Sequence, residues 1–190
     1  MKTRSMALAA LCAFLLFAEG CAVLSSVKTV TECDFAFAGL DSFSYAGVKL
    51  DKLANPSSLS LTDTINILTA LRDKKAKLTF NALVDIDNPH SGSASVEKLD
   101  WKLFLEGKEL LTGVNTDTIK IDPNSKTKAT IQANIDPTTV LSGGTLEDLW
   151  TLYCKLSGRE TSKKANLMLQ LKPTVGGRSY PDYLKLEKTL

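Results

Sequence analysis

The stretch NALVDIDNPHSGSASVEKLDWKLFLEGKEL, from Asn81 to Leu110, decides the fold. Its apolar and polar residues alternate up to Asn88-Pro89 and alternate again from Leu99. A period of two residues is typical of a strand that turns one face to a core. Because Pro89 cannot donate a hydrogen bond to a sheet, the first strand is expected to end near Asn88. The segment EGK at 106–108 then predicts a tight hairpin turn after the second strand.

The same alternation recurs on both sides of this stretch. It predicts further strands within residues 34–50, 77–88, 129–135, 165–171 and 180–186. Short alternating strands with a turn about every ten residues indicate an antiparallel β-sandwich. The predicted fold class is therefore mainly β.

Two segments change to the helical period of 3.6 residues. In Ser60–Asp73 the apolar residues that share a face are Leu61, Ile65, Leu68 and Leu71. In Thr145–Leu156 they are Leu149, Leu152, Tyr153 and Leu156. The first helix is expected to lie across the core, and the second is expected to begin with the capping pair Thr145 and Asp148 and to end at Gly158. The prediction is a β-sandwich with two added α-helices.

The N-terminal residues 1–20 are not expected to belong to the fold. Lys2 and Arg4 precede an apolar run from Met6 to Ala18, and Gly20-Cys21 follows. A membrane-spanning helix needs about 20 apolar residues, and this run is shorter. The pattern is typical of a secretory signal.

Cys21 gives the signal a more specific interpretation. Residues 16–21 (LFAEGC) resemble a bacterial lipoprotein signal, in which the cysteine becomes the first mature residue and carries acyl chains such as palmitate. Gly20 and Cys21 fit that pattern, whereas Ala18 and Glu19 depart from it. The alternative is an ordinary signal peptide that is cut elsewhere. Since each buried CH₂ contributes about 0.8 kcal/mol, several acyl chains on Cys21 would anchor the protein stably.

These observations predict three parts of the chain. Residues 1–20 would be a lipoprotein signal peptide, residues 21–31 the lipidated cysteine with a tether, and residues 32–190 the sandwich domain. Ala22, in place of Asp, resembles the sorting signal for the outer membrane of enterobacterial-type cells. The expected location is the bacterial cell envelope, with the protein anchored by lipid in the outer membrane and facing the periplasm.

Composition limits the classes of partner and chemistry. The chain has 190 residues, a formal net charge of +2 and one histidine, so no large basic field is present to bind nucleic acid. Of the four cysteines, Cys33 and Cys154 would remain for the domain. A disulfide could persist outside the cytoplasm, but two separate buried thiols are the favoured interpretation.

The ordered series of strand, Asn88-Pro89, loop, strand and Gly107 resembles the late embryogenesis abundant (LEA) type 2 family, also called the water stress and hypersensitive response (WHy) domain. Residues 119–136 (IKIDPNSKTKATIQANID) and 171–186 (LKPTVGGRSYPDYLKL) resemble the polar turn and the closing segment of that family. The resemblance implies a fibronectin-III/immunoglobulin-like sandwich and a structural role for Asn88, Pro89 and Gly107. It implies no catalytic residue, no cofactor and no metal.

His90 is the residue that an enzyme of the Ser-His type would need as its base. It lies beside Ser91 and Ser93, although serines in such a loop more often form hydrogen bonds within a turn. Asp85 and Asp87 share one strand face and could form a cation site, but a solvated outer face is the commoner reason for such a pair. A catalytic or metal-binding role is therefore not expected for these residues.

The basic residues Lys74, Lys75 and Lys77 follow the first predicted helix. They could meet anionic lipid headgroups, but cations also complement the dipole at the C-terminal end of a helix. The helix-end explanation is favoured.

The expected function is that of a lipid-anchored, non-enzymatic envelope protein with a binding or structural role in envelope or water stress. The expected partners are the membrane, through the N-terminal lipid, and an unknown protein or small apolar ligand. The alternative function is a carrier or binder of a small apolar or lipid ligand in a cavity of the sandwich. An open apolar cavity would favour this alternative.

Overall fold

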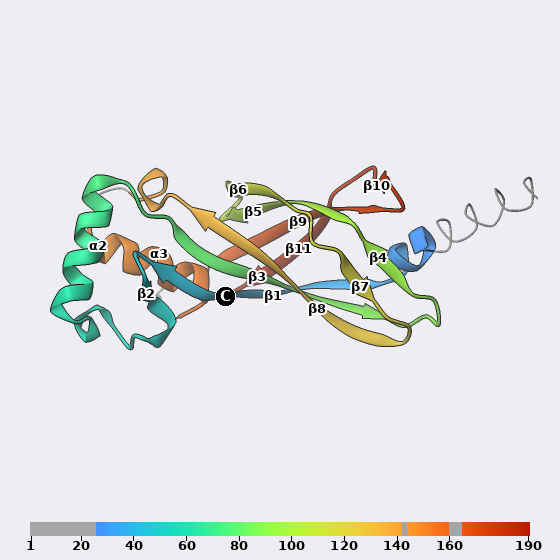
Figure 1. Cartoon of the computed structure of the whole chain (residues 1–190), viewed down its shortest axis with the longest axis horizontal. Helices are drawn as coiled ribbons and strands as arrows, with labels where there is room; N and C mark the ends of the chain where they lie inside the picture. Colours follow the sequence, from blue (N-terminus) through green and yellow to red (C-terminus); the bar gives the residue numbers. More distant parts are fainter. Residues whose placement is uncertain (1–25, 142–143, 160–164) are drawn as a thin grey trace, which may run out of the picture.

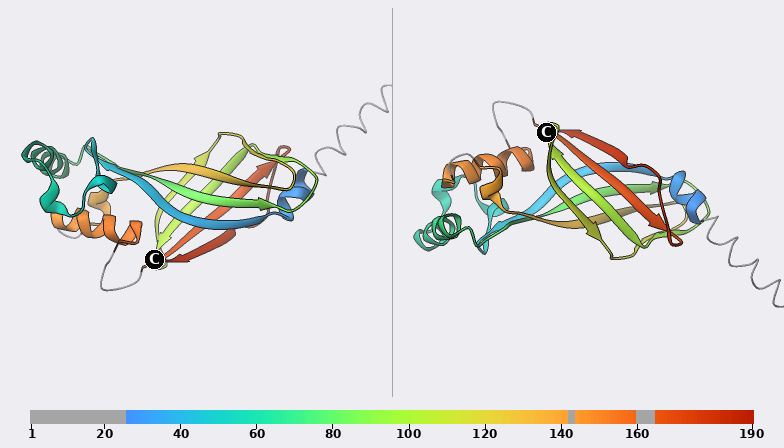
Figure 2. Two further views of the ribbon diagram at one scale, coloured as in Figure 1. Left: turned by 90° about the horizontal axis from the view of Figure 1, so that it is seen from below. Right: turned by 90° about the horizontal axis from the view of Figure 1, so that it is seen from above.

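The computed structural model describes residues 26–141, 144–159 and 165–190, and the strands of this part form two antiparallel sheets in separate layers (Figure 1, Figure 2). One sheet has the order β2-β1-β3-β8 and the other β10-β9-β5-β6, with β11 also paired to β9. The strands of the first sheet are β1 (Asp34–Tyr45), β2 (Val48–Lys49), β3 (Leu78–Asn88) and β8 (Ser125–Ile135). Those of the second are β5 (Lys98–Leu105), β6 (Lys108–Asn115), β9 (Asn166–Val175), β10 (Arg178–Ser179) and β11 (Leu184–Thr189). A short pair, β4 (Ala94–Val96) and β7 (Ile119–Ile121), completes the β structure of the described residues.

The alternating sequence places the core between these two sheets. In β3 the inward residues Leu78, Phe80, Ala82, Val84 and Ile86 are all buried. The corresponding positions of β8, β5 and β9 are also buried and form one hydrophobic cluster with those of β3. The predicted mainly-β antiparallel sandwich with added helices is confirmed.

The hairpin between β5 and β6 has the predicted tight turn. Leu105 pairs with Lys108, so Glu106 and Gly107 alone form the loop. Their φ angles are 51° and 76°, and two successive positive values are typical of the type I′ turn that matches the twist of the flanking strands. Gly107 therefore occupies a conformation that glycine adopts without the steric cost of a side chain.

The first strand is irregular around Gly39. The register of β1 on β3 shifts between Phe37 and Gly39 and again between Asp41 and Ser44. Gly39 has a φ of 129°, which a residue with a Cβ rarely adopts. Each shift adds one residue to β1 and reverses the alternation of its side chains, so two shifts cancel. Phe37 and Phe43 therefore face the same side of the sheet, and both are buried in the core.

Two α-helices and three short 3-10 turns of the described residues gather at one end of the sandwich (Figure 1). The α-helices there are α2 (Leu61–Asp73) and α3 (Leu146–Ser157), and the short 3-10 turns are η1 (Leu50–Lys52), η2 (Pro56–Ser58) and η3 (Pro137–Thr139). α3 begins as predicted, because the Asp148 N–H donates to Thr145 Oγ1 at 3.1 Å and the Thr145 N–H donates to Asp148 Oδ2 at 3.1 Å. Tyr153 of α3 meets the ring of Phe43 edge-on, with a centroid distance of 5.2 Å. None of the helices in the described ranges is long and apolar enough to cross a membrane.

The position of α2 corrects one prediction. The helix has the expected bounds, and the Asp63 N–H donates to Ser60 Oγ as its cap. However, Leu61, Ile65 and Leu68 are exposed, and the buried side is formed by Ile67 and Leu71. Because α2 lies across the end of the sandwich, only one narrow side of the helix meets the core, and the longer apolar line remains in solvent.

The second half of the expected tether is also different. Residues 26–31 are helical and pack on the end of the sandwich opposite α2 (Figure 1). Val30 is only 1% exposed and joins the hydrophobic core. The tether predicted for 21–31 therefore does not extend through residues 26–31, which dock on the sandwich through the buried Val30 side chain and a hydrogen bond from Tyr180 Oη to the Val27 carbonyl oxygen. The predicted signal peptide and Cys21 lie outside the described residues.

Candidate functional site at the N-terminal end of the sandwich

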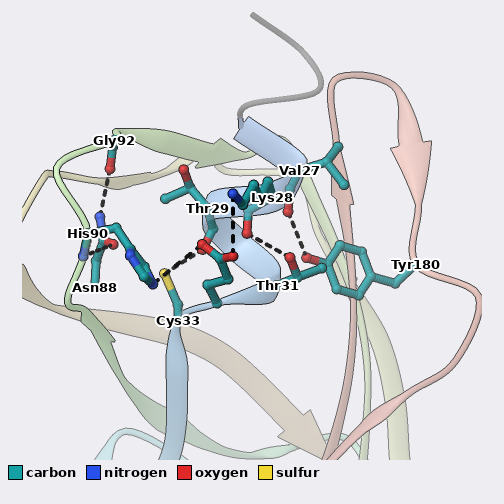
Figure 3. Close-up of polar contacts among 10 residues, drawn as sticks. Val27, Lys28, Thr29, Thr31, Cys33, Asn88, His90, Gly92 and Tyr180 are labelled. Atoms are coloured by element: carbon teal, nitrogen blue, oxygen red, sulfur yellow. Dashed lines mark hydrogen bonds and ion pairs between the residues drawn. The ribbon is translucent and has the colours of Figure 1, made fainter. Parts of the chain in front are cut away.

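Asn88 lies fully buried where β3 ends, and its side chain holds two loops together. Figure 3 shows its contacts with Gly92 and His90. Its Nδ2 donates to the carbonyl oxygen of Gly92 at 2.9 Å and to that of Asp122 at 2.8 Å. Its Oδ1 accepts a hydrogen bond from the His90 N–H at 3.1 Å. These three hydrogen bonds satisfy the buried amide group of Asn88. They also connect the backbone of the two loops beyond the last strand residue, where the sheet hydrogen bonds end.

The helical turn 26–31 packs against this pair of loops. A Cβ placed on Gly92 would lie 2.8 Å from Thr29 Oγ1, so only glycine lets the loop approach the turn so closely. On the other side of the turn, Tyr180 Oη donates to the Val27 carbonyl oxygen at 3.4 Å (Figure 3). The N-terminal end of the sandwich is thus assembled from three distant parts of the chain around one helical turn.

Cys33 and Tyr180 form the polar floor beneath the turn. The Cys33 thiol donates to the Thr29 carbonyl oxygen at 3.2 Å. Burial, followed by the nearby Asp34 carboxylate, raises the pKa of Cys33. Burial likewise raises the pKa of Tyr180 to about 12. Both groups are held in their neutral forms at neutral pH, which suits a packing role rather than nucleophilic chemistry.

His90 points toward the helical turn. Its Nε2 lies 3.4 Å from Glu32 Oε2, and about half of each side chain is exposed. The residues are therefore placed for an ion pair that fastens the loop to the turn when His90 is protonated. Its contact in the structure is with this carboxylate rather than with the Ser91 or Ser93 hydroxyls that a Ser-His mechanism would require.

Asp85 and Asp87 lie side by side on the outer face of β3, as predicted, but each faces a lysine of β8. The distances are 3.0 Å from Lys126 Nζ to Asp87 Oδ2 and 3.6 Å from Lys128 Nζ to Asp85 Oδ1. Within the described residues, no group of three or more His, Cys, Asp or Glu side chains could hold a metal ion. The pair forms an exposed cross-strand ladder of charges.

The two remaining cysteines lie apart. Cys33 and Cys154 are both free and buried, and burial is the first cause that raises the pKa of each thiol. The favoured interpretation of two separate buried thiols is confirmed.

A groove opens at the other end of the sandwich, between α3 and the β5–β6 hairpin. Its volume is about 410 Å³. The apolar residues that line it are Leu105, Leu110, Val140, Leu141 and Leu152. Glu106 and Lys108, on either side of Gly107, form part of its rim. The space between sheet and helix is thus an open surface groove, beside a core that large buried side chains fill.

The structure separates the three residues of the predicted motif. Asn88 and the exposed Pro89 lie at the N-terminal end, where Asn88 forms its buried network and Pro89 follows the last strand residue. Gly107 lies at the tip of the hairpin beside the groove. The sequence did not predict Gly92 or Tyr180 as parts of the site, although a glycine three residues after Pro89 was a signal of a close contact.

No protein-family model matches the chain, and no curated protein matches it. Solved structures do resemble it. A crystal structure of a protein from Archaeoglobus fulgidus has a TM-score of 0.38 and 15% identity, with 60% of this chain and 84% of that chain covered. A solution structure of a protein from Arabidopsis thaliana has a TM-score of 0.42 and 14% identity, with 60% and 70% covered.

A third structure, also determined in solution, is of a candidate late embryogenesis abundant (LEA) protein. Its TM-score is 0.40 and its identity 11%, and the match covers 95% of this chain and 80% of that chain. The sequence motif of Asn88, Pro89 and Gly107 resembles a family with the same name. At these TM-scores and identities, the likenesses assign the chain neither a family nor a function.

Proposed function

We propose that this protein is a lipid-anchored, non-enzymatic component of the bacterial envelope that acts through binding or structural support. The observation that carries the proposal is the docked turn 26–31, which follows Cys21 almost directly. Ser26 is five positions after Cys21, and a chain of five residues spans at most about 18 Å. An acylated Cys21 would therefore hold the rigid sandwich close to a bilayer surface, with its N-terminal end toward the lipid.

The contacts at this end support a mechanical role. The turn is held by the Val30 side chain in the core, by the Tyr180 hydroxyl and by the close contact of Thr29 with Gly92. A free tether through residue 31 would let the domain move farther from the membrane, whereas the docked turn leaves only residues 22–25 between the anchor and the domain. The protein would thus present its far end, with α2 and the groove, away from the anchor.

Kinship with the LEA type 2 family, a role in envelope or water stress, and an outer-membrane location that faces the periplasm belong to the same proposal. They rest on the sequence motifs around Asn88-Pro89, Gly107 and Cys21-Ala22. The contacts of His90 with Glu32, and of Asp85 and Asp87 with lysines, support a non-enzymatic role because each group has a structural partner.

Intact-mass analysis of the protein extracted from membranes tests the anchor. The expected species begins at Cys21 and carries the added mass of acyl chains. The Cys21→Ser variant is expected to lose this mass and to leave the membrane fraction, while the matched Cys154→Ser variant, which changes a buried thiol of the domain, keeps both. A wild-type chain that is soluble, unacylated and cut elsewhere would overturn the proposal.

A second candidate function is the binding of a small apolar or lipid ligand in the groove beside α3. The specific observation in its favour is the volume of about 410 Å³ with a floor of leucine and valine side chains, within the usual range for ligand sites. The test is mass spectrometry of lipids that copurify with the protein. Leu110→Trp, which fills the groove, should remove them, and Val114→Trp, on the same strand but outside the groove lining, should not.

A further inference from the structure

α2 carries an apolar stripe that nothing in the described structure covers. Leu61 is 78% exposed, Ile65 54% and Leu68 47%. Within the described residues, these are three of the four large hydrophobic side chains that are strongly exposed, the other being Val114 on β6. Because their spacing of four and three residues brings them onto one side of the helix, they form a continuous line rather than scattered contacts.

Basic residues continue this line. Arg72 follows Leu68 by four positions, so it lies on the same side of the helix, one turn further toward the C-terminal end. Lys74, Lys75 and Lys77 follow directly and are exposed. The C-terminal end of the apolar stripe is thus rimmed by cationic side chains.

The carboxylates near this rim do not neutralise it. Asp73 lies 3.0 Å from Arg72 Nε and 3.6 Å from Lys75 Nζ, and the Arg72 hydrogen bond is the first cause that lowers the pKa of Asp73. Asp136, whose pKa is lowered first by its hydrogen bond with Thr138, also interacts with Lys74 and Lys77. Arg72, Lys74, Lys75 and Lys77 therefore leave a surplus of positive charge beside Leu68.

We propose that α2 is a peripheral binding element for an anionic lipid bilayer. A helix with exposed leucine and isoleucine side chains beside lysine and arginine is suited to lie in the interface of a membrane, where its apolar side enters the acyl boundary and its cations meet the headgroups. The charge distribution argues for lipid over a second copy of this chain, because a second copy would bring the same positive surplus to the contact.

The location of α2 adds a consequence. In all three views, α2 lies at the end of the molecule opposite residues 26–31 (Figure 1, Figure 2). With the N-terminal anchor of the proposed function in one membrane, α2 would reach a different, facing surface. The lipid contact itself does not depend on the anchor, and it can be measured without it.

A local probe on α2 tests this proposal in the full-length chain. In a chain with Cys12→Ser and Cys21→Ser, an environment-sensitive dye is attached at Ile65→Cys; Cys33 and Cys154 are buried and stay unlabelled in the native protein. The matched control carries the dye at Val114→Cys, which is similarly exposed at 53% but lies on β6. Vesicles of phosphatidylglycerol and phosphatidylcholine are compared with phosphatidylcholine alone. The dye at position 65, and not at position 114, is expected to shift to shorter wavelength with the anionic vesicles.

Charge and stripe variants sharpen the test. Each basic residue near an anionic surface raises the affinity about fivefold. The double variant Lys74→Gln with Lys75→Gln should therefore lower the affinity for anionic vesicles, measured with the dye at position 65, about 25-fold. Leu61→Ser with Leu68→Ser should abolish the wavelength shift. Equal shifts at positions 65 and 114, or no dependence on anionic lipid, would overturn the proposal. So would concentration-dependent dimers that these serine substitutions dissolve, since the stripe would then be covered by a second copy. Because the probe chain lacks Cys21, failure here is separate from failure of acylation.

Discussion

Replacing Asn88 by alanine should destabilise the domain more than any other single hydrogen-bonding substitution on β3. The change removes three hydrogen bonds, to Gly92, Asp122 and His90, at a side chain that is 0% exposed. A hydrogen bond contributes about 1 kcal/mol net, and the partners left behind lose their contacts inside a packed site. The expected loss is about 3 kcal/mol, a large share of the 5–15 kcal/mol that is typical of a domain.

Urea unfolding followed by tryptophan fluorescence measures this loss. Trp101 is buried on β5 and reports the core. The matched control is Asn81→Ala on the same strand, since Asn81 Nδ2 donates only one exposed hydrogen bond, to Asp41 Oδ1 at 3.1 Å. That variant should lose less than about 0.5 kcal/mol. If Asn88→Ala also lost less than about 1 kcal/mol, the assignment of Asn88 as the residue that holds both loops would be refuted.

The variant Asn88→Asp tests the same network, because the geometry predicts in which direction its loss of stability changes with pH. A carboxylate would place oxygen, in place of Nδ2, 2.9 Å and 2.8 Å from the carbonyl oxygens of Gly92 and Asp122. The folded state should therefore raise the pKa of the new acid above its unfolded value of about 3.9. A raised pKa means that the protonated form is favoured on folding, so the destabilisation is greatest at neutral pH and shrinks as the pH falls toward the unfolded pKa. A variant whose deficit grew on acidification would contradict this geometry.

Three further predictions concern the interior. Tyr45→Phe should leave stability unchanged or raise it by up to about 1 kcal/mol in the same urea assay, because Tyr45 Oη is buried without a hydrogen-bond partner among the described residues; a clear loss would reveal a partner. Gly113→Ala should cost about 1–3 kcal/mol, because the new Cβ would lie 2.5 Å from Trp101 Cζ2; a neutral result would show that the indole can move. Burial is the main cause that raises the pKa values of Tyr153 and Tyr180 to about 12, above the unfolded value of about 10. For Tyr153 the nearby Asp51 carboxylate adds to this effect. The stability from these raised values is present below pH about 10 and is lost as pH rises toward about 12, and the double Phe variant should show a flatter alkaline loss when unfolding is followed against pH.

The sequence predicted what depends on local pattern. Alternation in β3 identified the inward apolar residues from Leu78 to Ile86, because side chains of a strand point to opposite faces regardless of what they meet. The type I′ turn at Glu106-Gly107 and the capping pair Thr145 and Asp148 were predictable for the same reason, since each is decided within four residues of chain.

The rest depended on contacts between distant parts of the chain. α2 has two apolar sides, and its period cannot say which of them, that of Leu61 or that of Ile67, meets the core. Asn88 was expected to be structural through kinship, but one of its two acceptors is the carbonyl of Asp122, 34 residues away. The docking of residues 26–31 likewise depends on Tyr180, at the opposite end of the sequence.

The pairing of β1 has a mechanical consequence. β1 starts beside residues 26–31, runs toward the helices and pairs antiparallel with β3 from Asp34–Asp87 to Ser44–Thr79 (Figure 1). The hydrogen bonds of such a ladder lie perpendicular to the strands, so a pull along β1 loads all of them in shear at once. A pull on residues 26–31 along the long axis, with the other strands of the sandwich held in place, would therefore have to break the ladder as a whole instead of peeling β1 away bond by bond.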